Sequence, residues 1–174
     1  MPMQPVQTQK NETVLEGFFP DAFHQTLSKD IYTTFVGSQL PDNKVFVVLG
    51  TDSGLLLDYL QRIATTGQRF ICVDFPEVIE YIQQTRKELL QNKGAFKLKL
   101  FTFDDFTFDC LYDNYQDYVM RNAIILLRSL VVVQNNSLYS GVNAKYNELF
   151  LRFRIDQVDN RDFKKVFDQQ LESV

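Results

Sequence analysis

The stretch Lys44–Gly54, with the sequence KVFVVLGTDSG, constrains the fold of this chain more than any other. Its five apolar residues Val45–Leu49 leave no polar face, which is typical of a strand covered on both sides in a parallel sheet. Gly50 ends this strand, and Gly54 stands where a helix would begin. The next apolar residues fall on one face at helical spacing: Leu55, Leu56, Tyr59, Leu60 and Ile63. We therefore predict a strand, a glycine-bounded turn and a helix.

A second all-apolar strand follows at Arg69–Asp74 and ends in an acid twenty residues after Gly54. We predict further strands at 96–101 and 129–134, an edge strand at 31–36, and helices from Pro76 and over 113–127 and 145–153. Strands that alternate with helices indicate a parallel sheet with right-handed crossovers. The expected fold is α/β, a three-layer, Rossmann-like sheet of the methyltransferase type, mostly parallel, with helices on both faces and strand order 3-2-1-4.

The length of 174 residues suits one domain of ordinary size. We assign residues 1–30 to an N-terminal tail with short helices and residues 31–160 to the Rossmann-like domain. Residues 161–174 are assigned to a C-terminal helix, or to a linker that leads to a missing downstream domain.

Composition excludes several kinds of partner. A net charge of −4 offers no basic surface for nucleic acid, and no apolar run approaches the roughly 20 residues that span a bilayer. The first residues lack the basic-then-apolar pattern of a signal peptide. Cys72 and Cys110 stand far apart and are interpreted as reduced thiols. We therefore expect a cytoplasmic protein that binds neither nucleic acid nor membrane.

A candidate ligand site is predicted where the strands end, because parallel strands bring their carboxyl ends to one edge of the sheet. The residues expected there are Gly50, Asp52, Gly54, Asp74, Asp104, Asp105, Asn135 and Asn136. Two acids about 4 Å apart repel each other by on the order of 4 kcal/mol at an effective dielectric near 20. The edge should therefore favour hydroxyl-rich or cationic ligands over phosphates.

Two interpretations of the glycine turn remain open. In one, its backbone N–H groups face a ligand at the helix N-terminus, and Asp74 accepts hydrogen bonds from a ribose. In the other, Gly50 and Gly54 only form a strand–helix turn, and Asp74 only caps the next helix. A methyltransferase usually has an acid at the position of Val48 and a glycine at that of Asp52. Without these, no catalytic residue is expected, and no zinc spacing or nucleophile elbow predicts a metal or a hydrolase.

The runs 45–60 and 70–82 resemble the N-terminal domain of the motility accessory factor (Maf) family of bacterial flagellin glycosyltransferases. There too an apolar strand runs into a glycine turn and an amphipathic helix, and the next strand ends in an acid before another helix. The run Arg128–Val133, followed by Leu138 and Tyr139, resembles the last strand and helix of that domain. The similarity covers residues 30–160.

This resemblance implies a non-catalytic accessory or binding domain of a protein glycosyltransferase, with no cofactor of its own. Its partners would be a downstream domain of the same polypeptide and flagellin or another protein. The alternative is a methyltransferase-like, small-molecule-binding protein that takes S-adenosylmethionine.

Overall fold

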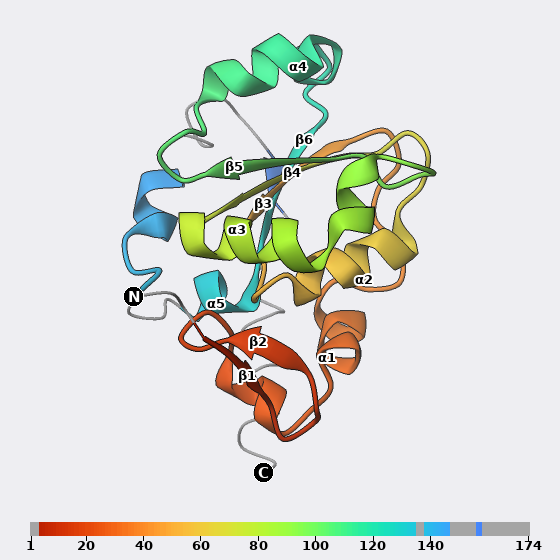
Figure 1. The fold of residues 1–174 in the computed structure, drawn as a ribbon. Coiled ribbons are helices and arrows are strands. Elements are labelled where there is room, and N and C mark those ends of the chain that lie inside the picture. Colours follow the sequence, from red (N-terminus) through yellow and green to blue (C-terminus); the bar gives the residue numbers. More distant parts are fainter. Residues whose placement is uncertain (1–3, 135–137, 147–155, 158–174) are drawn as a thin grey trace.

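The computed structural model describes residues 4–134, 138–146 and 156–157 of the chain (Figure 1). Its main sheet is parallel and has the strand order β5-β4-β3-β6-β7. The strands are β3 (Val45–Leu49), β4 (Arg69–Asp74), β5 (Leu98–Thr102), β6 (Ile124–Arg128) and β7 (Asp156–Gln157). The predicted α/β class is confirmed, and the order 3-2-1-4 holds with β6 as the fourth strand, at 124–128 and not at the predicted 129–134. Asn135, Asn136, the predicted C-terminal helix and most of the predicted helix 145–153 lie outside the described residues.

Strand β3 lies at the centre of the sheet, as its sequence predicts. All five of its side chains are buried. It pairs with β4 on one side and with β6 on the other, so that Val47 stands opposite Ile71 and Leu126. A strand covered on both faces must be apolar throughout, which explains its run of valines.

Helices cover both faces of the sheet. Helices α2 (Leu55–Ile63) and α3 (Pro76–Thr85) lie on one face, and α4 (Phe108–Met120) lies on the other (Figure 1). A short 3-10 helix, η2 (Lys87–Gln91), follows α3. This arrangement is what right-handed crossovers produce when the chain moves outward from β3 to β5 and then returns to β6.

The predicted edge strand at 31–36 is wrong, because these residues belong to helix α1 (Ser28–Phe35). The buried side chains Ile31, Tyr32 and Phe35 recur at the spacing of one helix face. Two threonines between them misled the prediction, since β-branched residues favour strands. In the helix, the Thr33 and Thr34 hydroxyls donate to carbonyl oxygens four residues earlier.

The fourth strand was predicted at 129–134, but it lies just before that segment, at 124–128. Residues 123–133 form an almost continuous apolar run, in which a buried strand and a buried helix look alike. Asn122 adopts a left-handed conformation with φ of 55° just after α4 ends, and β6 then begins at Ile124. The predicted strand at 129–134 is instead a single helical turn, α5 (Leu130–Val133).

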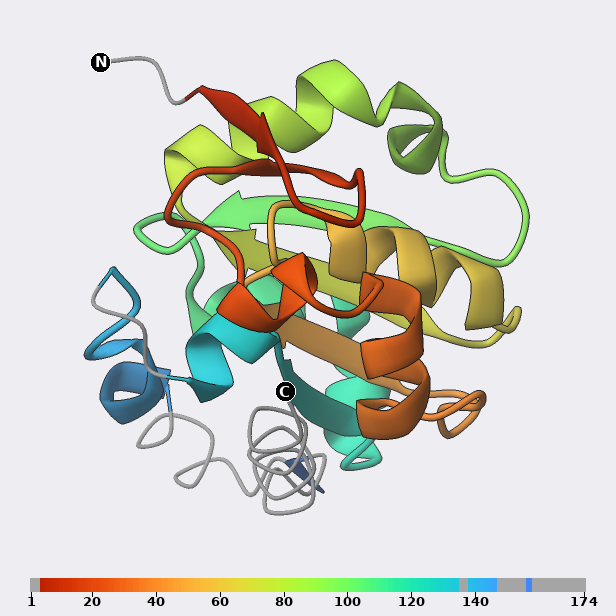
Figure 2. The same cartoon turned by 90° about the horizontal axis from the view of Figure 1, so that it is seen from below.

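Residues 1–30 were assigned from the sequence to a tail with short helices, but from β1 onward they form part of the folded domain. Strands β1 (Pro5–Gln7) and β2 (Thr13–Leu15) form an antiparallel hairpin, and a 3-10 helix, η1 (Asp21–His24), follows. Figure 2 shows this hairpin together with α1, α2 and α3 in one view. Val14 and Phe23 are fully buried, so this segment contributes to the hydrophobic core.

We predict that Gly50→Ala destabilises the fold far more than Gly141→Ala. Both glycines have positive φ, 73° and 89°. A Cβ at Gly50 would overlap Ser129 Oγ and stand 2.8 Å from Val132 Cγ2, whereas at Gly141 it would meet nothing within 4 Å. Backbone strain alone costs about 1–2 kcal/mol, and overpacking should add about 1–3 kcal/mol at Gly50 only. Urea unfolding measures both, and equal losses would contradict the predicted contact.

Candidate functional site

The turn between β3 and α2 is built from left-handed residues. Gly50, Asp52, Ser53 and Gly54 have φ values of 73°, 52°, 61° and 92°. The Gly54 N–H donates to the Thr51 carbonyl and hydroxyl, and Leu55 and Leu56 donate to carbonyls of the same turn. These three donors stabilise the turn itself, which favours the interpretation that Gly50 and Gly54 form a strand–helix turn.

Asp52 is fully buried, and its carboxylate joins three separate elements. It accepts hydrogen bonds from the Tyr32 hydroxyl of α1 at 2.6 Å and from the backbone N–H groups of Leu130 and Val131 at 3.2 and 3.0 Å. Burial raises the pKa of Asp52 to about 6, although these donors pull it down. The side chain therefore satisfies the buried N–H groups of the first turn of α5, which has no side-chain cap of its own.

Asp74 is fully buried as well and has three donors. They are the Thr51 hydroxyl at 2.9 Å, the Phe75 N–H at 2.8 Å and the Tyr139 hydroxyl at 2.7 Å. Burial raises the pKa of Asp74 to about 6, and nearby Asp52 adds to the rise. Phe75 is the N-cap of α3 and no side chain caps this helix, so the predicted capping role of Asp74 is wrong.

Each buried carboxylate thus faces a tyrosine. Burial and the adjacent carboxylates raise the pKa of both Tyr32 and Tyr139 above its ordinary value, so both hydroxyls stay protonated and can donate. Hydrogen bonds to charged acceptors are stronger than those between neutral groups. Hydroxyl donors therefore fill the role that a cation or a hydroxyl-rich ligand was expected to fill.

Aromatic rings cover Asp74 at the carboxyl edge. Tyr139 packs against Phe75 with ring centres 4.9 Å apart and against Phe18 at 6.2 Å, and Phe75 packs against Phe103 at 5.0 Å. Phe18, Phe103 and Tyr139 are buried. The space beside the ends of β4 and β5 is therefore occupied by the protein's own rings.

Ser53 fastens the N-terminal segment to this edge. Its hydroxyl accepts from the Leu15 N–H and donates to the Phe18 carbonyl, both at 2.9 Å. Ser53 is completely buried. The turn that was predicted to hold a ligand thus holds β2 and the residues that follow it.

The eight predicted site residues do not all lie together at a solvent-exposed edge of the sheet. Gly50, Asp52, Gly54 and Asp74 do meet at the edge, but the two acids among them are buried. Asp104 and Asp105 follow β5 and are exposed. Asn135 and Asn136 lie outside the described residues, and a ligand-binding role for the set stays a prediction.

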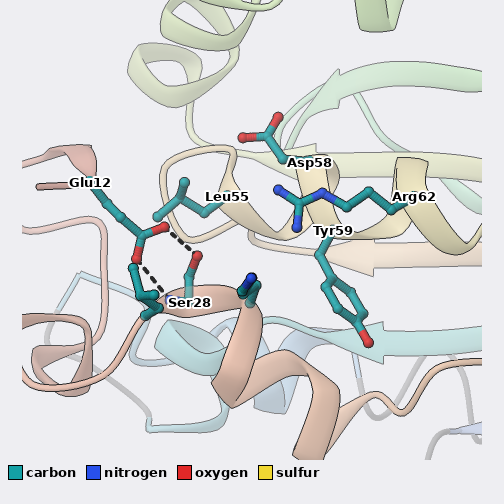
Figure 3. Close-up of a pocket in the computed structure, with 8 residues that line it drawn as sticks. Glu12, Ser28, Leu55, Asp58, Tyr59 and Arg62 are labelled. Atoms are coloured by element: carbon teal, nitrogen blue, oxygen red, sulfur yellow. Dashed lines mark hydrogen bonds between the residues drawn. The ribbon is translucent and has the colours of Figure 1, made fainter. Parts of the chain in front are cut away.

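An open, polar groove lies elsewhere, along the outer side of α2 (Figure 3). One part has a volume of about 240 Å³ and reaches Glu12, Ser28 and Lys29, and the other has a volume of about 590 Å³ and reaches Tyr81, Arg86 and Glu88. Leu55, Asp58 and Arg62 line both parts.

Sequence reasoning missed this groove. The only local signal was an acid and a base four residues apart on a predicted helix, Asp58 and Arg62, a spacing that most often forms an ordinary surface pair. The other lining residues come from distant parts of the chain, and only the folded structure brings them together.

No known family profile and no curated protein sequence matches this chain. Within residues 4–134, 138–146 and 156–157, no helix has both the length and the apolar character needed to cross a membrane. The same part of the chain contains no cluster of three His, Cys, Asp or Glu side chains suited to a metal ion. Both cysteines are free, which agrees with their interpretation as thiols.

We predict that Asp52 and Asp74 make the fold less stable as pH rises from about 4 to about 6. The folded protein holds their protons up to about pH 6, whereas the unfolded chain releases them near 3.8. In this window the folded state binds more protons, so stability falls with rising pH, by up to about 3 kcal/mol for each group.

Urea unfolding between pH 4 and pH 7 tests this expectation. Asp52→Asn or Asp74→Asn should each remove part of the slope, whereas Asp104→Asn, at an exposed position, should leave it unchanged. Identical slopes in all three variants would show that the buried acids keep ordinary pKa values.

Proposed function

We propose that this chain is a non-catalytic accessory or binding domain in which the ligand-binding edge of a Rossmann-like sheet serves a structural purpose. The single observation that supports this most strongly is the Asp74 carboxylate. It stands at the end of the strand beside β3, where a ribose would be bound, yet Thr51, Phe75 and Tyr139 already donate to it.

A nucleoside would have to compete with these internal contacts. To accept from a ribose in the usual way, Asp74 would give up a buried donor, and each hydrogen bond to a charged group contributes about 1.5–3 kcal/mol. The base would also have to displace rings that pack on Tyr139 at 4.9–6.3 Å. Both costs oppose the binding of a nucleotide at this edge.

The wider context we propose is a cytoplasmic protein glycosyltransferase of the motility accessory factor type, which glycosylates flagellin. The support for it is the resemblance over residues 30–160, together with an α/β sheet of the expected order. In such a protein, transfer chemistry belongs to a separate sugar-nucleotide domain of the same polypeptide. The present chain would bind a partner, which is either the sugar-nucleotide domain or the acceptor protein.

Calorimetry with S-adenosylmethionine and with a nucleoside diphosphate tests the proposal against the methyltransferase alternative. We expect no binding heat from the wild-type chain with either compound, because Asp74 is not accessible. Micromolar binding of S-adenosylmethionine that Asp74→Asn abolishes and Asp104→Asn preserves would overturn the proposal. Thermal unfolding of both variants would verify that each is folded.

A further inference from the structure

The groove beside α2 contains four charged side chains on its Glu12 side, and two of them already have partners. The Glu12 carboxylate accepts from the Ser28 N–H at 2.8 Å and from the Ser28 hydroxyl at 2.5 Å (Figure 3). It therefore satisfies the first turn of α1 and is neutralised in part by the positive end of that helix.

Asp58 also has a partner within the protein. Its two carboxylate oxygens accept from Arg86 Nε and Nη2 at 2.9 and 3.1 Å, in the two-pronged geometry that favours arginine. Arg86 is almost buried and donates in addition to the Thr85 hydroxyl. Asp58 and Arg86 both line the larger part of the groove.

Because Asp58 pairs with Arg86, it is not available as an ion-pair partner for Arg62. Arg62 stands four residues after Asp58 on α2, the spacing at which the two would ordinarily pair. Within the part of the chain that the structure describes, neither the Arg62 side chain nor the Lys29 side chain donates a hydrogen bond or forms an ion pair. In Figure 3 the Arg62 side chain extends along the groove toward Leu55.

We propose that this groove binds an acidic polypeptide segment, with the carboxylate of an Asp or Glu side chain placed between Arg62 and Lys29. The inference rests on the proposed role as a binding domain and names the surface that carries it out. The charges on the Glu12 side support it, because Glu12 and Asp58 have partners within the protein, whereas the Arg62 and Lys29 side chains have none among the described residues.

We assign the site between Arg62 and Lys29 to a carboxylate, and competition with phosphate tests this assignment. Glu12 and Asp58 still carry negative charge close to both cations. A phosphate monoester has a charge near −1.5 to −2 at neutral pH, so both its attraction to the cations and its repulsion from the carboxylates would exceed those of a single carboxylate. A guanidinium group matches the planar, two-oxygen form of a carboxylate, and it matches a phosphate as well.

The shape of the groove favours a chain over a small acid. Beyond Leu55 it continues into the larger part, where Gln61 and Tyr81 offer polar side chains. A backbone that follows this path would find hydrogen-bonding groups beyond the anchoring carboxylate. A free monocarboxylate would use only the space between Arg62 and Lys29.

The test is a fluorescence anisotropy titration of the full chain with labelled hexaglutamate, and with hexaglutamine as the uncharged control. We expect Arg62→Gln and Lys29→Gln each to weaken hexaglutamate binding about fivefold, which corresponds to about 1 kcal/mol for a partly exposed charge pair. Lys93→Gln removes the same charge from an exposed position outside the groove and should leave the affinity within about twofold.

Three results would overturn the proposal: no binding of hexaglutamate, equal weakening by all three variants, or equal binding of hexaglutamine. Competition identifies the ligand further. Inorganic phosphate that displaces the peptide better than acetate would exclude a carboxylate site, and acetate as potent as the peptide would exclude a chain. Binding of S-adenosylmethionine at Asp74 would refute the proposed function while leaving the Arg62 and Lys29 effects intact, so the two failures are distinguishable.

Discussion

The buried carboxylate of Asp52 is the interaction on which this domain most depends. It stands at the end of the central strand and binds the Tyr32 hydroxyl of α1 and two backbone N–H groups of α5. Burying a charge is costly unless donors surround it. Here every donor belongs to another segment, so the turn, α1 and α5 must come together at once. The left-handed backbone at Asp52, with φ of 52°, is held by these contacts.

This arrangement changes what the end of the sheet can do. In a nucleotide-binding sheet, the turn after the first strand and the acid after the second are left open to a ligand. In this chain Ser53 holds the N-terminal segment, Asp74 holds Tyr139, and aromatic rings fill the adjoining space. The same positions that would recognise a ribose now connect segments far apart in the sequence, which favours a structural role for them.

The accessible polar chemistry lies instead on the side of α2. One ion pair determines which charges in the groove are available. Arg86 pairs with Asp58, so Arg62 does not. Arg86 can reach Asp58 partly because Gly54 has no side chain, as a Cβ there would stand 2.8 Å from the guanidinium carbon. Gly54, the N-cap of α2, thus helps to shape the groove. The turn between β3 and α2 therefore contributes both to the closed carboxyl edge of the sheet and to the open groove.

The sequence alone determined that the sheet is parallel and that Val45–Leu49 is its central strand, because an all-apolar run has only one environment that covers both of its faces. It also determined that Gly50, Asp52 and Asp74 meet at one edge, since parallel strands end together. It did not separate strand from helix at 31–36 or 129–134, where short apolar runs fit both periods. Tertiary structure alone decided that Asp52 and Asp74 are buried, because their donors Tyr32, Leu130, Val131 and Tyr139 stand 20 to 79 residues away. The sequence around an acid does not reveal hydrogen bonds to residues so far along the chain. These hydrogen bonds decide whether an acid at a strand end faces a ligand or the core.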